Sequence, residues 1–146
     1  MRCVVQKVLS SSVTVDGKLI NKIDKGLTVL VGFTHDDTEV DIDWMVRKVV
    51  NLRVFEDEND VMNLSILDVG GEILSISQFT LYGDPKKGNR PSYINALGGE
   101  KAEPMYELFN KKLNEHVKTY GGVFGADMKV EILNDGPCTI IIDSKI

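Results

Sequence analysis

One run of seven mostly apolar residues, 27–33, constrains the fold of this chain more than any other feature. Only Thr28 and Gly32 interrupt the run, and it is much shorter than the roughly 20 residues that a membrane-spanning helix needs. A short apolar run of this kind is typical of a strand buried on both faces of a sheet. We therefore expect a sheet in which this strand is covered on both sides.

The residues before this run predict a hairpin. Apolar and β-branched residues dominate 3–8, 13–15 and 19–20, and Asp16 and Gly17 separate the last two groups. Both central residues of a type I′ turn need positive φ, and an Asp-Gly pair adopts that conformation readily. We expect two antiparallel strands joined at Asp16-Gly17.

Two amphipathic helices are predicted from the spacing of apolar side chains. Thr38 is expected to cap the first, with Asp41 completing a capping box. Pro104 is expected in the first turn of the second, because proline lacks the N–H that later turns require, so this helix should begin near Glu103 or slightly earlier. The apolar positions are Ile42, Met45, Val49 and Leu52 in the first helix, and Ala102, Met105, Tyr106, Phe109 and Leu113 in the second.

Further strands are predicted over residues 72–81, 128–132 and 139–142, and a turn at Gly70-Gly71. Many strands with two main helices favour an α+β class. We expect a β-rich single domain over residues 1–146, whose sheets pack on each other or close like a barrel.

Composition excludes several classes of protein. The chain has 146 residues, 42% of them apolar, and 17 Lys and Arg against 22 Asp and Glu give a net charge of −5. This balance is typical of a globular domain and not of a disordered chain. A mildly acidic total argues against a DNA partner, although it leaves room for one local basic patch that contacts a phosphate backbone.

The cysteines and the start of the chain indicate a cytoplasmic protein with no membrane partner. Cys3 and Cys138 lie far apart, as expected of two reduced thiols, and residues 1–12 lack the apolar segment of a signal peptide. His35 and His116 share no ligand spacing with each other or with the cysteines, so we expect no metal site. The sequence also lacks a phosphate-binding glycine loop, and we expect no cofactor.

Two segments could carry chemistry. At Ser77, Gln78, Phe79 and Thr80 the preceding strand loses its apolar alternation. The hydroxyls of Ser77 and Thr80 can simply hydrogen-bond neighbouring backbone at the strand end. Alternatively, they and the backbone N–H groups of a rigid strand end can surround a reacting carbonyl. The second segment, 134–139, has the composition of a turn.

A basic loop follows the first segment. Lys86, Lys87 and Arg90 either form a solvated run of charge or bind RNA phosphates. Their position directly after the polar segment favours the second interpretation, because a phosphate grip beside a polar pocket suits an RNA end.

At these residues the sequence resembles the D-aminoacyl-tRNA deacylases over essentially its whole length. Ser77-Gln78-Phe79-Thr80 is similar to the family motif S-Q-x-x-T, and residues 134–139 are similar to N-x-G-P-x-T. The resemblance implies the family fold, a homodimer, and a hydrolase that cleaves the ester bond of D-aminoacyl-tRNA and of mischarged glycyl-tRNA.

The resemblance also implies roles for individual residues. Ser77, Gln78, Phe79 and Thr80 would be catalytic. A cis Gly136-Pro137 bond would reach into the active site of the other subunit and act as a chiral filter, rejecting L-aminoacyl groups by steric clash. Contacts to the substrate and the tRNA would come from Lys86, Lys87, Arg90, Phe124 and Met128.

Three alternatives remain open. Thr80 could act as the nucleophile, although no His or Lys lies near it in sequence, or the vicinal 2′-OH of the ribose could position or activate a water. The chain could also be a dimeric module that binds tRNA ends without chemistry. A hydrolase of some other small ester is the third alternative.

Overall fold

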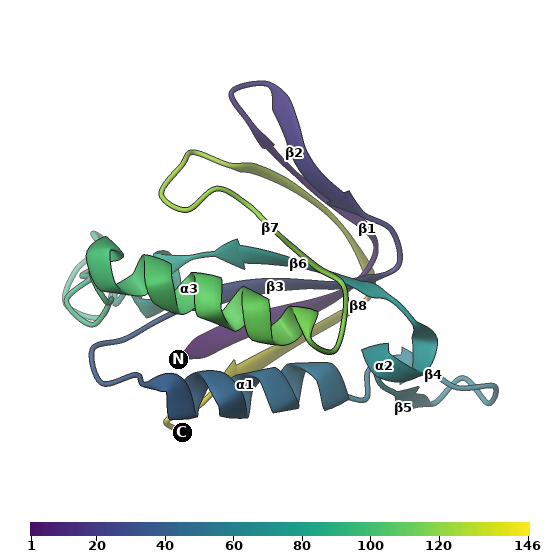
Figure 1. The fold of residues 1–146 in the computed structure, drawn as a ribbon. Helices are drawn as coiled ribbons and strands as arrows, with labels where there is room; N and C mark the ends of the chain where they lie inside the picture. Colours follow the sequence, from purple (N-terminus) through teal and green to yellow (C-terminus); the bar gives the residue numbers. More distant parts are fainter.

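A single long strand, β1 (Arg2–Val15), organises the sheet of this protein (Figure 1). The computed structural model describes all residues, 1–146. One edge of β1 pairs with β3 (Gly26–Gly32) over its first half and with β2 (Lys18–Ile23) over its second half. Its other edge pairs with β8 (Lys129–Asp143) along nearly the whole strand. β1 therefore lies inside the sheet over its full length.

Two parallel strands extend the sheet beyond β3. β6 (Glu72–Ser77) pairs with β3, and β7 (Thr119–Gly121) pairs with β6. The sheet curves so strongly that the Asn21 side-chain amide of β2 donates to the Gly121 carbonyl of β7, with 2.6 Å between the heavy atoms. This contact brings the two ends of the sheet together, so the expected barrel-like closure is confirmed.

The local predictions for the first third of the chain are confirmed. Asp16 and Gly17 join β1 to β2 with φ values of 50° and 75°, as a tight hairpin requires. β3 is buried along almost its entire length, with only Leu30 partly accessible. The apolar run therefore forms the covered strand that its composition predicts.

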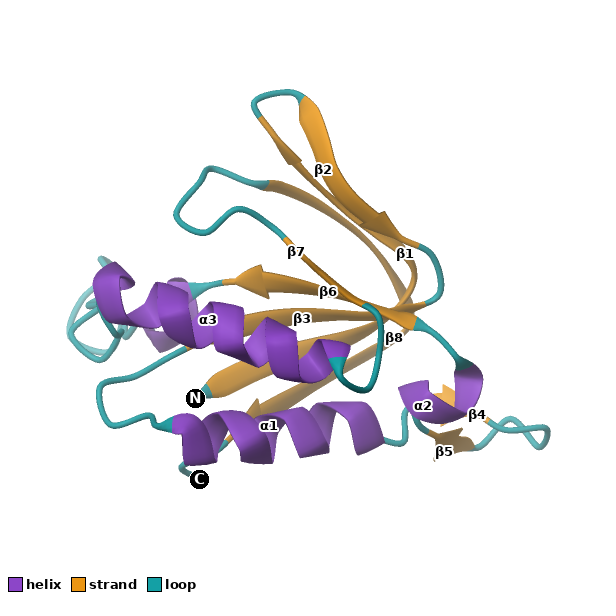
Figure 2. Ribbon diagram, in the orientation of Figure 1, coloured by secondary structure: helices purple, strands orange, loops and turns teal.

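Helices α1 (Glu39–Asn51) and α3 (Gly99–Asn114) lie on one face of the sheet (Figure 2). Their apolar stripes pack with β1, β3 and β6 in a core of 21 buried residues, which includes Met45 and Phe109. Lys112 of α3 forms ion pairs with Glu39 and Asp43 of α1. Apolar contacts in the core and ion pairs at the surface therefore hold the two helices in place.

Thr38 caps α1 as predicted, and Asp41 completes the capping box. Burial alone would raise the pKa of Asp41. The Thr38 backbone N–H, the Ser144 hydroxyl and the Lys145 ammonium outweigh that effect and lower the pKa to about 2, from the ordinary 3.8. The Asp41 carboxylate therefore ties the start of α1 to the chain after β8.

Because the folded pKa of Asp41 is depressed, its contribution to stability should be complete above about pH 5 and lost as the pH falls from 4 to 2. We expect about 1–2 kcal/mol of the free energy of unfolding to disappear over this window through Asp41. Urea unfolding at pH 7 and pH 2.5 would measure it. An Asp41→Asn protein should be less stable at pH 7 and lose less stability on acidification; an equal acid loss in both proteins would contradict this.

The second helix begins earlier than predicted. α3 starts at Gly99 with Gly98 as its N-cap, so Pro104 lies in the second turn and not in the first. Pro104 removes one hydrogen bond, the bond to the carbonyl of residue 100. Glu100 lies on the exposed face of the helix, where water can satisfy that carbonyl. The prediction of a start near Glu103 or slightly earlier, with Pro104 in the first turn, was wrong because the helix accommodates Pro104 one turn later.

Two predicted segments also end differently. The strand expected over residues 72–81 stops at Ser77, and a short 3₁₀ helix, η1 (Phe79–Tyr82), follows it. Residues 134–139 do not separate two strands, because β8 continues through them as a bulge. Asn134 pairs with Val8 and Thr139 with Gln6, so four residues of β8 stand opposite Lys7 alone.

The Asn134 side-chain amide holds this bulge in place. It donates to the carbonyls of Lys7 and Cys138, each at 3.0 Å. These bonds replace part of the pairing that the extra residues interrupt. The remaining small elements are β4 (Phe55–Glu56), β5 (Met62–Leu64) and α2 (Ile66–Val69). None of the helices combines the length and the apolar character needed to cross a membrane.

Candidate active site

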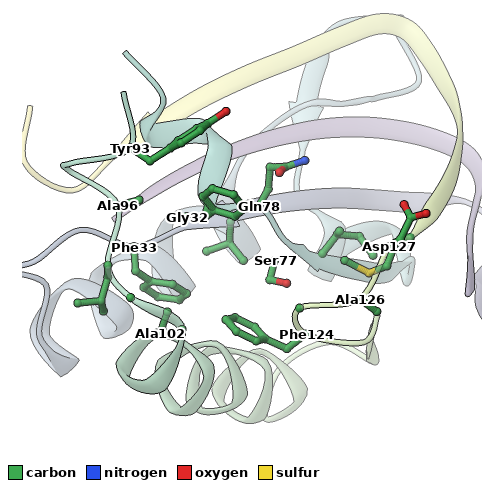
Figure 3. Close-up of a pocket in the computed structure, with 18 of the residues that line it drawn as sticks. Gly32, Phe33, Ser77, Gln78, Tyr93, Ala96, Ala102, Phe124, Ala126 and Asp127 are labelled. Atoms are coloured by element: carbon green, nitrogen blue, oxygen red, sulfur yellow. The ribbon is translucent and has the colours of Figure 1, made fainter. Parts of the chain in front are cut away.

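A cavity of about 610 Å³ opens where the parallel strands β3 and β6 end (Figure 3). Ligand sites of sheets with parallel strands are common at the carboxyl ends of those strands. The first turn of α3 and two loops complete the wall. Its lining comprises Val31, Gly32, Phe33, Ile76, Ser77, Gln78, Phe79, Tyr93, Ala96, Leu97, Gly98, Gly99, Ala102, Phe124, Gly125, Ala126, Asp127, Met128 and Val130.

The end of β6 places polar atoms on the cavity. Ser77 is half-buried and, together with Phe33 and Phe124, surrounds one space, and Gln78 follows it (Figure 3). The Gln78 backbone N–H donates to the Val31 carbonyl at 2.7 Å, so this N–H is already occupied. The two predicted residues Ser77 and Gln78 therefore face the cavity from a backbone that β3 holds firmly.

Two aromatic side chains form the outer wall. The rings of Phe79 and Tyr93 meet edge to face with 5.0 Å between centroids, and both are exposed, at 55% and 41%. Sequence reasoning included Phe79 but gave Tyr93 no role. Its aromatic character inside a long polar loop was the available signal, but nothing local indicates that this loop folds back onto η1.

Thr80 does not line the cavity. It is exposed, and its hydroxyl donates to the Gln78 side-chain carbonyl at 2.5 Å. Neither histidine contacts it: His35 shares a hydrogen bond with the Ile94 carbonyl at 2.6 Å, and His116 is exposed beyond the end of α3. Thr80 therefore lacks the adjacent base that an activated hydroxyl needs.

Phe124 and Met128 line the opposite wall, as the predicted substrate contacts would. Phe124 packs on Tyr106 with 5.9 Å between ring centroids. The Tyr106 hydroxyl donates to the Ser75 carbonyl at 2.6 Å and accepts from the Gly122 N–H at 3.2 Å. Tyr106 thereby fixes the loop that carries Phe124 to the strand that carries Ser77.

The cavity offers little side-chain chemistry of its own. Its only carboxylate, Asp127, is exposed and pairs with Lys129 at 3.1 Å. The chain has no group of three or more His, Cys, Asp or Glu side chains placed to hold a metal ion. What the cavity can supply is shape, apolar surface and main-chain hydrogen-bonding groups.

Gly136 and Pro137 lie outside this cavity. Both are exposed on the β8 bulge, and the peptide bond between them is cis. Beneath the bulge the Lys7 ammonium lies 3.5 Å from Asp135 and 3.9 Å from Glu56, on a side chain that is only 7% exposed. An ion pair with one buried partner holds the bulge against β1.

The predicted basic loop is also outside the cavity. Lys86, Lys87 and Arg90 are exposed in the segment that links η1 to Tyr93, and none forms an ion pair. The structure thus brings Ser77, Gln78, Phe79, Phe124 and Met128 together around one space. It leaves the three cations, Thr80 and Gly136-Pro137 outside it.

Solved structures share this fold over almost the full chain. One is described as a probable eukaryotic D-amino acid tRNA deacylase; it superposes with a TM-score of 0.83 and 15% identity, covering 97% of each chain. Another, described as c-Myc DNA Unwinding Element Binding Protein, has a TM-score of 0.90 and 44% identity and covers 98% of each chain. The chain therefore has the fold of a probable D-amino acid tRNA deacylase.

Sequence comparison places the chain more narrowly. The family model for D-Tyr-tRNA(Tyr) deacylase matches residues 4–143. D-aminoacyl-tRNA deacylases of Clostridium botulinum strains Langeland and Okra are each 57% identical over 146 residues, covering 99% of this chain and 98% of theirs. The chain belongs to the D-Tyr-tRNA(Tyr) deacylase family and is a hydrolase. The resemblance inferred from the two motifs is confirmed.

Proposed function

We propose that this protein hydrolyses the ester between a D-amino acid and the terminal ribose of a tRNA. One observation carries the proposal: the polar end of β6, Ser77 and Gln78, faces a cavity of about 610 Å³ whose lining is mostly apolar. The names of the 57% identical relatives support the same substrate. Water adds to the aminoacyl carbonyl, the ribose oxygen leaves with a proton, and free amino acid and tRNA result.

In this mechanism the chain contributes placement more than chemical groups. No side chain around the cavity forms a nucleophile and base pair, and the Thr80 hydroxyl is bound to Gln78. The ester is activated relative to an amide, so the neighbouring 2′-OH of the ribose can position or activate the water. Main-chain N–H groups of Ser77 and Phe79 are the candidates for stabilising the oxyanion, since the N–H of Gln78 is bound to Val31.

A second copy of the chain would discriminate between D- and L-aminoacyl groups. Gly136 and Pro137 do not line the cavity of their own subunit, although they are exposed on the same strand as the apolar side chains Leu133 and Ile141. The unpaired edge of β8 and these exposed apolar side chains, with the exposed Leu9 of β1, are features of the kind that a homodimer buries. The dimer would bring Gly136-Pro137 of one subunit to the cavity of the other.

The bulge is suited to the role of a steric filter because it is firmly held. Asn134 bonds the Lys7 carbonyl of β1 and the Cys138 carbonyl at the end of the bulge, and the buried Lys7 ammonium pairs with Asp135. Main chain occupying the volume of an L side chain would exclude L-aminoacyl groups. Glycine carries no side chain to exclude, so glycyl-tRNA should be accepted as well.

The substrate contacts follow from the same placement. The exposed Phe79 and Tyr93 rings at the outer wall offer a surface for the end of the tRNA, and the walls of Phe124 and Met128 enclose the aminoacyl group. Lys86, Lys87 and Arg90 would contact nearby phosphates. Each of these contacts is part of the proposal.

Hydrolysis of D-tyrosyl-, glycyl- and L-tyrosyl-tRNA by the purified protein tests these points together. We expect the D-tyrosyl and glycyl esters to be cleaved at rates within about tenfold of each other, and the L-tyrosyl ester at least about 100-fold more slowly. Equal rates on the D and L esters would refute the filter. Tight, salt-dependent binding of uncharged tRNA with no hydrolysis would identify a binding module instead.

A further inference from the structure

A basic groove that shares no residue with the cavity lies at the C-terminal end of α1. It is an open surface groove of about 530 Å³ lined by Trp44, Arg47, Lys48, Asn51, Leu52 and Arg53. Three of these six side chains are cations, and no carboxylate is among them. In a chain with a net charge of −5, this is a local concentration of positive charge that the overall composition conceals.

The cations of the groove are not neutralised by neighbours. Arg47, Lys48 and Arg53 are exposed, and none lies within 4.0 Å of a carboxylate oxygen. Lys112 of the adjacent helix α3 shows the contrast, because it pairs with both Glu39 and Asp43 of α1. The charge at this end of α1 therefore remains available to a ligand.

Stabilisation of the helix end explains only part of the cluster. A cation in the last turn offsets the partial negative charge at a helix C-terminus, and Lys48 occupies that position. Arg53 lies beyond the helix, and its guanidinium donates to the Asn63 carbonyl at 2.9 Å and to the Asn63 side chain. Arg53 is thus held in one orientation at the rim, as a preorganised anion contact would be.

An aromatic surface accompanies the charge. Trp44 is half-buried, and the Lys48 ammonium lies 5.6 Å from the centre of its ring. Cations beside a partly accessible aromatic ring suit nucleic acid, because the cations contact phosphates while the accessible part of the ring packs on a sugar or base. This combination favours nucleic acid over an acidic peptide.

We propose that this groove binds the sugar-phosphate backbone of the tRNA substrate at a distance from the ester. The proposal rests on the proposed function. α1 begins six residues after Phe33 of the cavity lining, and its 13 residues span about 20 Å; the other end of the helix, which carries the groove, lies beside α2 (Figure 1). An RNA that is held by its 3′ end in the cavity and runs along α1 passes over Arg47 and Lys48.

The test is a double charge reversal, Arg47→Glu with Lys48→Glu, which leaves the structural Arg53 in place. Uncharged tRNA should bind at least about tenfold more weakly, and the slope of log affinity against log salt should be shallower by about 2. Fluorescence anisotropy across a salt series measures both quantities. Because uncharged tRNA is the probe, this readout does not depend on whether the protein is a deacylase.

A matched control separates this site from overall charge. Lys18→Glu with Lys22→Glu makes the same charge change on the exposed face of β2. This control variant should bind tRNA with an affinity within about threefold of the unchanged protein, because salt screens charges that lie far from the bound RNA. Equal losses of tRNA affinity in both double variants would overturn the proposal. An unchanged salt slope in the Arg47 and Lys48 variant would overturn it as well.

A second readout links the groove to catalysis. The Arg47 and Lys48 variant should have a raised KM for D-tyrosyl-tRNA, but it should hydrolyse D-tyrosyl-adenosine, which lacks the rest of the RNA, at the unchanged rate. A loss on the small ester as well would overturn the proposal. So would a loss of binding to anionic vesicles with no change toward tRNA, which would assign the groove to a membrane surface.

Discussion

A D-tyrosyl-tRNA whose terminal ribose lacks the 2′-hydroxyl should be hydrolysed at least about 100-fold more slowly than the ordinary ester. The cavity contains no His or Lys, and its one carboxylate is exposed and paired with Lys129, so the chain has no evident base for the attacking water. The ribose hydroxyl next to the ester is then the group that we expect to take part in proton transfer. Single-turnover rates on the two substrates, both charged on the 3′-oxygen, would measure the difference.

The same mechanism makes a prediction for Thr80. Its hydroxyl is bound to the Gln78 side chain and Thr80 is not among the residues that line the cavity, so Thr80→Ala should keep the rate within about tenfold. Thr80→Val, which preserves shape, serves as the matched control for packing. A 2′-deoxy substrate that is cleaved normally, together with a Thr80→Ala protein that is inactive, would reverse the assignment and make Thr80 the nucleophile.

Gly26→Ala is expected to lower the free energy of unfolding by at least about 3 kcal/mol. Gly26 begins β3 opposite Glu72 of β6, and a Cβ at Gly26 would overlap the Glu72 carbonyl. The obstacle is backbone and not a flexible side chain, so the parallel pair could accept the methyl group only by separating. Urea unfolding followed by circular dichroism would measure the loss.

Gly98→Ala is the control for this substitution. Gly98 has an ordinary φ of −63°, and a Cβ there would meet no atom within 4 Å. We expect a change within about 1 kcal/mol, the range of a weak helix cap. Similar losses for both substitutions would show that the close approach of β3 and β6 is not what makes Gly26 necessary.

The features that could be predicted from the sequence are those determined within a few residues. The turn at Asp16-Gly17 and the cap at Thr38 depend on side chains adjacent to the backbone they stabilise. Ser77 and Gln78 were recognisable because a strand loses its alternation there. Each of these signals lies inside a window of about ten residues.

The remaining features depend on contacts between distant parts of the chain. The sheet closes through Asn21 and Gly121, which are 100 residues apart. The bulge in β8 exists because Asn134 finds the Lys7 carbonyl, 127 residues away, and so a segment with turn composition stays in a strand. Tyr93 reaches the cavity for a similar reason, since its loop folds back onto Phe79.

The bulge that carries Gly136-Pro137 belongs to the strand that pairs with β1 over most of its length. If the bulge is the steric filter that we propose, substrate selectivity and the stability of the fold depend on the same stretch of backbone. Mutations that loosen the bulge would then also weaken the sheet. A variant that has lost its selectivity would therefore be unstable and degraded before it could hydrolyse correctly charged tRNAs. The architecture would in this way protect protein synthesis from its own proofreader.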